Sequence, residues 1–236
     1  MSNLPKIDEF FEAGAHFGHL REKWHPKMKP YIFSIRNNTH IFNLESTLES
    51  LEKAIDFIKA QIVDGKMVLF IGTKRQAREA IKEAAITLGM PYIDYRWLGG
   101  TLTNFETIQK NLKRFKEAQE KNKDKEFVSV MTKKEKKNFD LELEKMERNL
   151  GGIQDIERIP DALFIVDAIG EKVAVEEANQ MNLPVIGIID SDSNPDKFAY
   201  PIPANDDSKL TIKLILKTIV ENCQDTKKNT KKEAKK

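Results

Sequence analysis

Cysteine is almost absent from this chain of 236 residues, and other hallmarks of particular protein classes are missing with it. Because Cys223 is the only cysteine, an intramolecular disulfide and a zinc site made of cysteines are excluded, as is typical of a reducing compartment. The first eight residues are too short and too polar for a signal peptide. No apolar run approaches the roughly 18 residues of a membrane span. These absences predict a soluble, cytoplasmic protein without a membrane segment.

A strong net charge is also missing. The chain has 39 basic and 37 acidic residues, so its formal net charge is only +2, although charged residues make up 32% of the total. A hydrophobic content of 40% is enough to bury a core. Because no strong overall field exists, any affinity for nucleic acid must come from basic residues that cluster locally.

The motifs of common catalytic sites are absent as well. The sequence has no nucleophile elbow, no His-Glu-x-x-His pair and no glycine-rich nucleotide cradle. Gly72-Thr73-Lys74-Arg75 lies where a predicted strand turns into a helix, and Lys74 and Arg75 there could hold an anion. We favour an RNA phosphate as that anion, with a plain strand-to-helix turn as the competing interpretation. The alternative function is an α/β enzyme that uses a phosphorylated ligand here, near Asp190.

Alternating strand and helix patterns indicate the fold class. Continuous apolar runs at residues 67–71, 162–166 and 185–189 predict buried parallel strands, and residues 92–95 predict a short one. Helices are predicted at residues 46–64, 74–88, 171–181 and 209–220 between or after these strands. This order predicts an open, mostly parallel sheet between helices, formed by residues 1–104 and 152–223, with a stiff, extended N-terminal arm.

A different pattern occupies residues 105–151. Apolar residues recur there at spacings of three and four, in two heptad seams, and Thr132 with Glu135 forms a capping box for the second helix. We predict an inserted antiparallel coiled-coil hairpin that projects from the α/β domain; two ordinary amphipathic helices on the sheet are the alternative. The lysine-rich tail, residues 224–236, has no apolar period and is predicted to be disordered.

Four segments are candidates for nucleic-acid contact: residues 21–33, the turn at residues 72–75, residues 96–104 and the basic residues of the hairpin. In residues 96–104, an arginine beside a tryptophan precedes twin glycines and polar residues, which suits a surface that meets a polyanion. Residues 21–33 mix cations, aromatics and prolines, and packing of the aromatics on the core is the alternative there. The predicted RNA-binding residues are Arg21, Lys23, Trp24, Lys27, Lys29, Lys74, Arg75, Arg96, Trp97, Thr101, Thr103, Asn104, Lys110, Lys113 and Arg114.

Metal binding has weaker support. His16 and His19 could share one face, and Asp190, Asp206 and Asp207 could meet at the edge of the sheet, where a structural Mg²⁺ or Zn²⁺ ion would fit. Neither set has a strong ligand spacing, and acidic residues at strand ends more often close turns or cap helices. No catalytic residue and no other cofactor is predicted.

The chain resembles the bacterial small-subunit ribosomal protein two family in five segments. They are residues 16–19 (His-Phe-Gly-His), 24–31, 70–74, 96–104 (Arg-Trp-Leu-Gly-Gly-Thr-Leu-Thr-Asn) and 160–167. The resemblance runs in order from about Gly14 to Val220. It implies a flavodoxin-like three-layer α/β domain with an inserted coiled-coil hairpin. It also implies binding to small-subunit ribosomal RNA between head and body on the solvent side of the cytoplasmic ribosome.

The resemblance further implies contact with other small-subunit proteins, including the large first protein of the subunit, which helps to recruit messenger RNA. A membrane and a small-molecule substrate are not among the implied partners. The main hypothesis is therefore a structural, RNA-binding component of the ribosome without catalytic turnover. A protein adaptor whose hairpin binds a partner helix is a third possibility.

Overall fold

The computed structural model describes residues 4–233, except for the side chains of residues 125, 126, 128 and 225–233. Its centre is a sheet of five parallel strands: β4 (Val68–Ile71), β5 (Tyr92–Ile93), β6 (Ala162–Val166), β7 (Val185–Ile189) and β8 (Tyr200–Pro203). The strand order is β5-β4-β6-β7-β8. Numbered from β4, this is the 2-1-3-4-5 order of flavodoxin-like folds, so the predicted parallel α/β sheet is confirmed.

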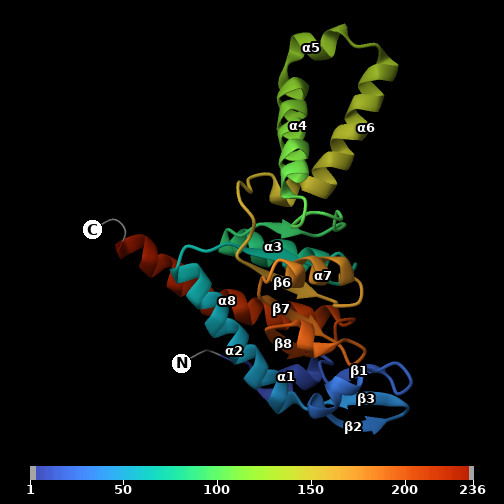
Figure 1. Cartoon of the computed structure of the whole chain (residues 1–236), viewed down its shortest axis with the longest axis vertical. Helices are drawn as coiled ribbons and strands as arrows, with labels where there is room; N and C mark the ends of the chain where they lie inside the picture. The colour runs from blue at the N-terminus through green and yellow to red at the C-terminus, as the bar shows by residue number, and fades with distance from the viewer. Residues whose placement is uncertain (1–3, 234–236) are drawn as a thin grey trace.

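Helices cover both faces of this sheet (Figure 1). Alternate side chains of each strand point to opposite faces, so the apolar residues of both faces need a covering layer. Val68 and Phe70 pack toward α2 (Leu44–Val63), α3 (Arg78–Leu88) and α8 (Lys209–Glu233). Leu69 and Ile71 pack toward the other face, which is covered by α7 (Lys172–Gln180) and the foot of the helical projection. Because all five strands are parallel, their carboxyl ends lie at the same edge of the sheet.

The N-terminal segment differs from the predicted extended arm. It contains α1 (Ile7–Glu12), η1 (Pro26–Tyr31) and an antiparallel sheet of β1 (Phe17–Leu20), β2 (Ile32–Arg36) and β3 (Thr39–Phe42), in the order β1-β3-β2. Asn37 and Asn38, which join β2 to β3, both have positive φ values of 48° and 60°. Two such residues in succession form the tight turn that suits a twisted hairpin, so this pair folds the segment back on itself.

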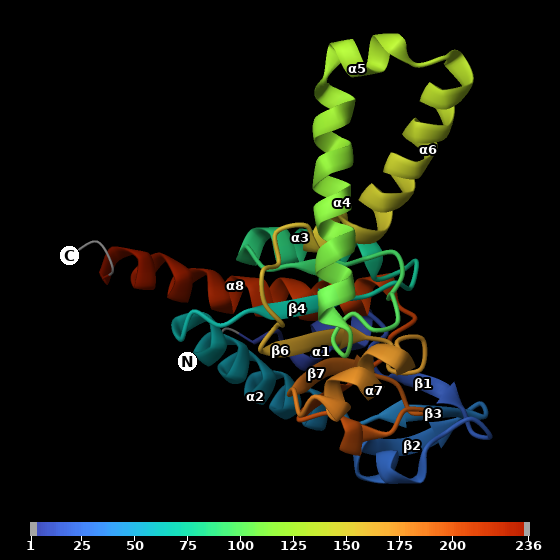
Figure 2. The ribbon, with the colours of Figure 1, turned by 45° about the horizontal axis from the view of Figure 1, so that its top comes forward.

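Residues 105–153 form a helical projection that rises from the body (Figure 1). It consists of α4 (Phe105–Lys123), α5 (Lys125–Val130), α6 (Lys133–Leu150) and η2 (Gly151–Ile153), and Thr132 and Glu135 form the predicted capping box. The short α5 was not predicted. Figure 2 shows α4 and α6 close at the foot and apart toward the tip. A regular coiled coil therefore stays a prediction.

The C-terminal helix is longer than predicted. The apolar pattern predicts an end near Val220, whereas α8 continues to Glu233, through most of the segment predicted to be disordered. Residues 221–233 contain neither glycine nor proline, so no residue in them stops the helix. Residues 234–236 lie outside the described part of the chain. Within residues 4–233, no helix is both long and apolar enough to cross a lipid bilayer.

Candidate nucleic-acid interface

A single carboxylate from α7 organises the loop at residues 96–104. Glu177 Oε1 accepts hydrogen bonds from Trp97 Nε1 at 2.9 Å and from the amide of Gly100 at 2.8 Å. Its Oε2 accepts from the amide of Leu102 at 3.0 Å and from the amide and hydroxyl of Thr103, both at 3.2 Å. Gly100 has φ +86°, a conformation that glycine adopts without strain. The loop is therefore held in one shape by a residue more than 70 positions away.

Glu177 is buried yet charged. Burial by itself would raise its pKa, but the hydrogen bonds from Trp97 and from the loop amides together hold the pKa below its usual value. Sequence reasoning missed this residue. Ala174, Val175 and Ala178 of the same helix are buried, so an acidic residue within an otherwise apolar face was the available signal.

The loop exposes only part of its predicted RNA-binding set. Trp97, a predicted RNA-binding residue, is not exposed: its ring packs in the core beside β5, and only 8% of the residue is accessible. Thr101 is buried too, and its hydroxyl donates to the carbonyl of Leu98. Arg96, Thr103 and Asn104 are exposed. Arg96 lies at the rim of a shallow hollow of about 310 Å³ that the foot of α4 helps to line.

The turn after β4 does not present Lys74 to solvent. Lys74 Nζ lies 2.7 Å from Asp206 Oδ1, 2.6 Å from Asp207 Oδ1 and 3.5 Å from Asp167 Oδ2. A lysine held by three carboxylates has no charge left to offer a phosphate, so the anion role predicted for Lys74 does not fit the structure. Arg75 beside it is exposed. Residues 74–77 form a turn and α3 begins only at Arg78, four residues later than predicted.

Two ionisable groups at this edge of the sheet have strongly shifted pKa values. Burial, together with Asp167 and Asp190, raises the pKa of Asp206 to about 7, although the ammonium of Lys74 acts in the opposite direction. His19 lies at the same sheet edge, and its Nδ1 is 3.0 Å from Asp190 Oδ2. Hydrogen bonding to Asp190 raises the pKa of His19 to about 9, against the lowering effect of burial.

The five candidate metal ligands do not form one ligand set. Asp206 and Asp207 bind Lys74, His19 binds Asp190, and His16 stacks on Phe11 with ring centroids 4.3 Å apart. Among the residues that the structure describes, no group of three or more His, Cys, Asp or Glu side chains is placed to hold a metal ion.

The raised pKa of His19 predicts that stability depends on pH. A histidine whose pKa rises from 6.5 in the unfolded chain to about 9 in the folded protein stabilises the fold fully below pH 6.5. That contribution disappears as the pH rises from 6.5 through 9. We expect the free energy of unfolding in urea to fall between pH 7 and 9.5. In His19→Gln the same fall should be absent, and an equal fall in both proteins would contradict the assignment.

The basic residues of the N-terminal segment are mostly free. Arg21, Lys23 and Lys29 are exposed, whereas Lys27, also exposed, pairs with Asp196. The ring of Trp24 packs near that of His40, with centroids 5.2 Å apart, and 37% of the residue remains accessible. On α4, the predicted residues Lys110, Lys113 and Arg114 are all exposed.

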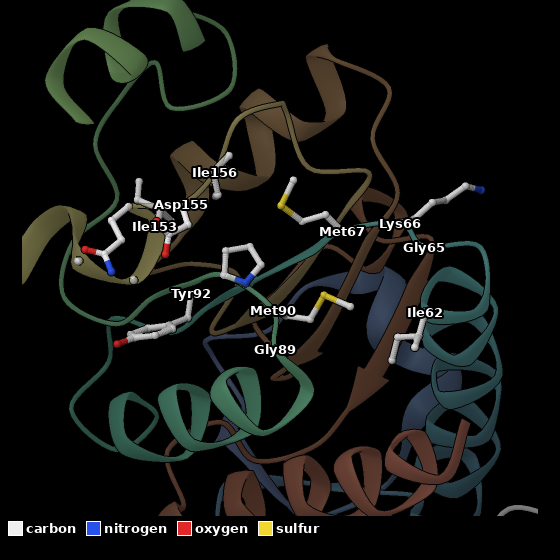
Figure 3. A pocket seen from close by; sticks show the side chains of 14 residues that line it. Ile62, Gly65, Lys66, Met67, Gly89, Met90, Tyr92, Ile153, Asp155 and Ile156 are labelled. Carbon is white, nitrogen blue, oxygen red and sulfur yellow. The ribbon is translucent and has the colours of Figure 1, made fainter. Parts of the chain in front are cut away.

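A separate hollow of about 700 Å³ lies at the opposite edge of the sheet, near the amino end of β4. Figure 3 shows that Met67, Met90 and Ile153 help to line it, while the side chain of Lys66 points away. Its two charged lining residues are Lys66 and Asp155, and no nucleophile with an adjacent base accompanies them. This hollow offers no catalytic arrangement, and the lysine–carboxylate cluster occupies the edge where the alternative enzyme would bind its ligand.

Comparison with known proteins identifies the family of this chain. The family model described as ribosomal protein S2 matches residues 10–226. The small ribosomal subunit protein uS2 of Thermobifida fusca (strain YX) is 45% identical over 215 residues, which cover 91% of this chain and 74% of that protein. The chain therefore belongs to the ribosomal protein S2 family and is a structural constituent of the small ribosomal subunit, not an enzyme.

Proposed function

We propose that this protein binds small-subunit ribosomal RNA between the head and the body on the solvent side of the subunit. The observation that carries the proposal is Arg96, an exposed guanidinium on a loop that Glu177 holds in one conformation. A guanidinium can grip a phosphate through two parallel hydrogen bonds, and a preformed loop loses little conformational entropy when it does so. The small ribosomal subunit protein uS2 of T. fusca is, by its name, part of the same particle.

Further exposed cations extend this surface. None of them forms an ion pair with another described residue, so their charge is available to phosphates. They are Arg21, Lys23, Lys29, Arg75, Lys110, Lys113 and Arg114. Thr103 and Asn104 add polar contacts beside Arg96, and Trp24 offers part of one ring. We leave Lys74, Trp97 and Thr101 out of the proposed contact set because partners or burial occupy them, and Lys27 is given a minor role because it is paired with Asp196.

Arg96→Ala is expected to weaken RNA binding without unfolding the body. The side chain is exposed and makes no hydrogen bond to another described residue, so its removal costs the fold little. We expect the affinity for small-subunit RNA to fall several-fold and its dependence on the logarithm of salt concentration to lose roughly one unit of slope. Filter binding at several salt concentrations measures both. A lower melting temperature, with an unchanged slope of log affinity against log salt concentration, would show that Arg96 stabilises the fold instead.

We further propose that the large first protein of the subunit docks on an apolar surface formed by α1 and the N-terminal sheet. Phe11, Phe17, Phe33 and Ile35 are exposed there by 61, 47, 76 and 46%, beside a hollow of about 870 Å³. A contiguous exposed apolar surface of this kind is typical of a protein–protein contact and does not suit a phosphate backbone.

Phe33→Asp is expected to release the docked protein while RNA binding persists. Because Phe33 is the most exposed of these aromatic side chains, a charge there should not disturb the core. We expect loss of the large first protein from subunits purified in low salt, whereas this chain itself still co-sediments with them. Phe17→Ala provides a second, milder change at the same surface. Retention of the large protein by both variants would show that it docks elsewhere.

A further inference from the structure

Tyr95 carries two arginine guanidinium groups on its ring. The guanidinium carbon of Arg78 lies 4.9 Å from the ring centroid, and that of Arg148 lies 4.3 Å from it. Tyr95 follows β5, Arg78 begins α3 and Arg148 lies in the last turn of α6. In Figure 1 the foot of α6 comes down beside the β5 end of the sheet, so this cluster joins the helical projection to the body.

The two like charges have no acidic partner within the part of the chain that the structure describes. Neither guanidinium forms an ion pair with a described residue, although both are confined near one ring. Arg78 donates from Nε to the carbonyl of Thr73 at 2.8 Å, which orients it and leaves its terminal N–H groups unused. Cation–π contact with the Tyr95 ring stabilises each guanidinium without neutralising its charge. A phosphate beside either guanidinium would supply the negative charge that no described residue provides.

Two further arginines lie close to this cluster in the sequence. Arg75 and Arg96 are exposed, and they flank Arg78 and Tyr95 in the sequence. Arg148 is exposed as well, while Tyr95 and Arg78 are half-buried. The surface is therefore an open one with preoriented donors, which suits successive phosphates of a chain better than a small enclosed ligand.

We propose that Arg78, Tyr95 and Arg148 form a phosphate-binding site for ribosomal RNA at the foot of the helical projection. The site rests on the proposed RNA-binding function and extends it to three residues outside the predicted RNA-binding set. Tyr95 is the positioning residue, because its ring contacts both guanidinium groups. Through these contacts, RNA bound here would touch the body and the projection at once.

The test uses the full chain and small-subunit ribosomal RNA, titrated over a range of salt concentrations. Arg78→Gln and Arg148→Gln are each expected to weaken binding by roughly three- to tenfold and to reduce the slope of log affinity against log salt by about 0.7 to 0.9. Tyr95→Leu should lower affinity while Tyr95→Phe, which keeps the ring, should not. Lys53→Gln is the matched control, because it removes one charge from an exposed residue of α2 that forms no ion pair among the described residues.

The outcomes separate this site from the broader function. If the unaltered protein fails to bind the RNA, the proposed function itself is wrong. If it binds and both arginine variants keep its affinity and salt slope, the site is refuted while the function stands. A lower melting temperature with an unchanged salt slope would make the cluster a brace between projection and body, which also overturns the proposal. Loss of slope in Arg78→Gln and Arg148→Gln but not in Lys53→Gln supports it.

Discussion

Glu177→Ala is expected to destabilise the protein by roughly 3 kcal/mol or more, because it leaves two buried donors and further half-buried ones without an acceptor at once. The indole N–H of Trp97 and the amides of Gly100, Leu102 and Thr103 all bind this one carboxylate. For a chain of this size the melting temperature should fall by about 6–12 °C. Because the loop at residues 96–104 loses its anchor, affinity for ribosomal RNA should fall as well, by more than the change in stability alone produces.

The fluorescence of Trp97 reports the local effect. In a Trp24→Phe background Trp97 is the only tryptophan. With selective excitation of tryptophan, its emission should shift to longer wavelength in Glu177→Ala as the ring gains contact with water. Glu176→Ala is the control, since that neighbour is an exposed carboxylate of the same helix. An unshifted spectrum with unchanged stability would mean that Glu177 does not hold the loop.

Lys74→Met should be nearly as damaging, at about 3 kcal/mol. Methionine keeps most of the volume but removes the ammonium that faces Asp167, Asp206 and Asp207, and Asp206 is almost fully buried. A buried carboxylate that loses the cation bound to it is strongly unfavourable. Urea unfolding at pH 7.5 measures the loss. The variant should regain stability as the pH falls toward 5, because burial then favours the protonated acid.

Asp206→Asn in the Lys74→Met background tests the same electrostatic cause. Removal of the buried charge should restore a large part of the stability that Lys74→Met loses, so the two changes are expected to be strongly non-additive. Additive losses would show that packing of the lysine stem, and not its charge, holds this edge of the sheet. RNA affinity at matched folded fraction should stay near that of the unaltered protein, since Lys74 is already paired.

Local patterns predicted the main architecture. The continuous apolar runs found β4, β6 and β7, the heptad seams found α4 and α6, and the capping box at Thr132 and Glu135 marked a real helix start. They could not find the N-terminal sheet, whose turn depends on the left-handed conformations of Asn37 and Asn38. Nor did they find the end of α8, because a lysine-rich segment without helix breakers is compatible with either a helix or a disordered tail.

The site shows the same division. The sequence alone was enough to identify the loop at residues 96–104, the basic segments and the lack of a catalytic set, because these depend on residue type and order. Tertiary structure decided which of those side chains meet solvent. Glu177, far along the chain, draws Trp97 inward and leaves Arg96 outside, and Asp206 and Asp207 neutralise Lys74 from another strand end. Exposure and charge pairing depend on contacts between distant segments, so no local pattern encodes them.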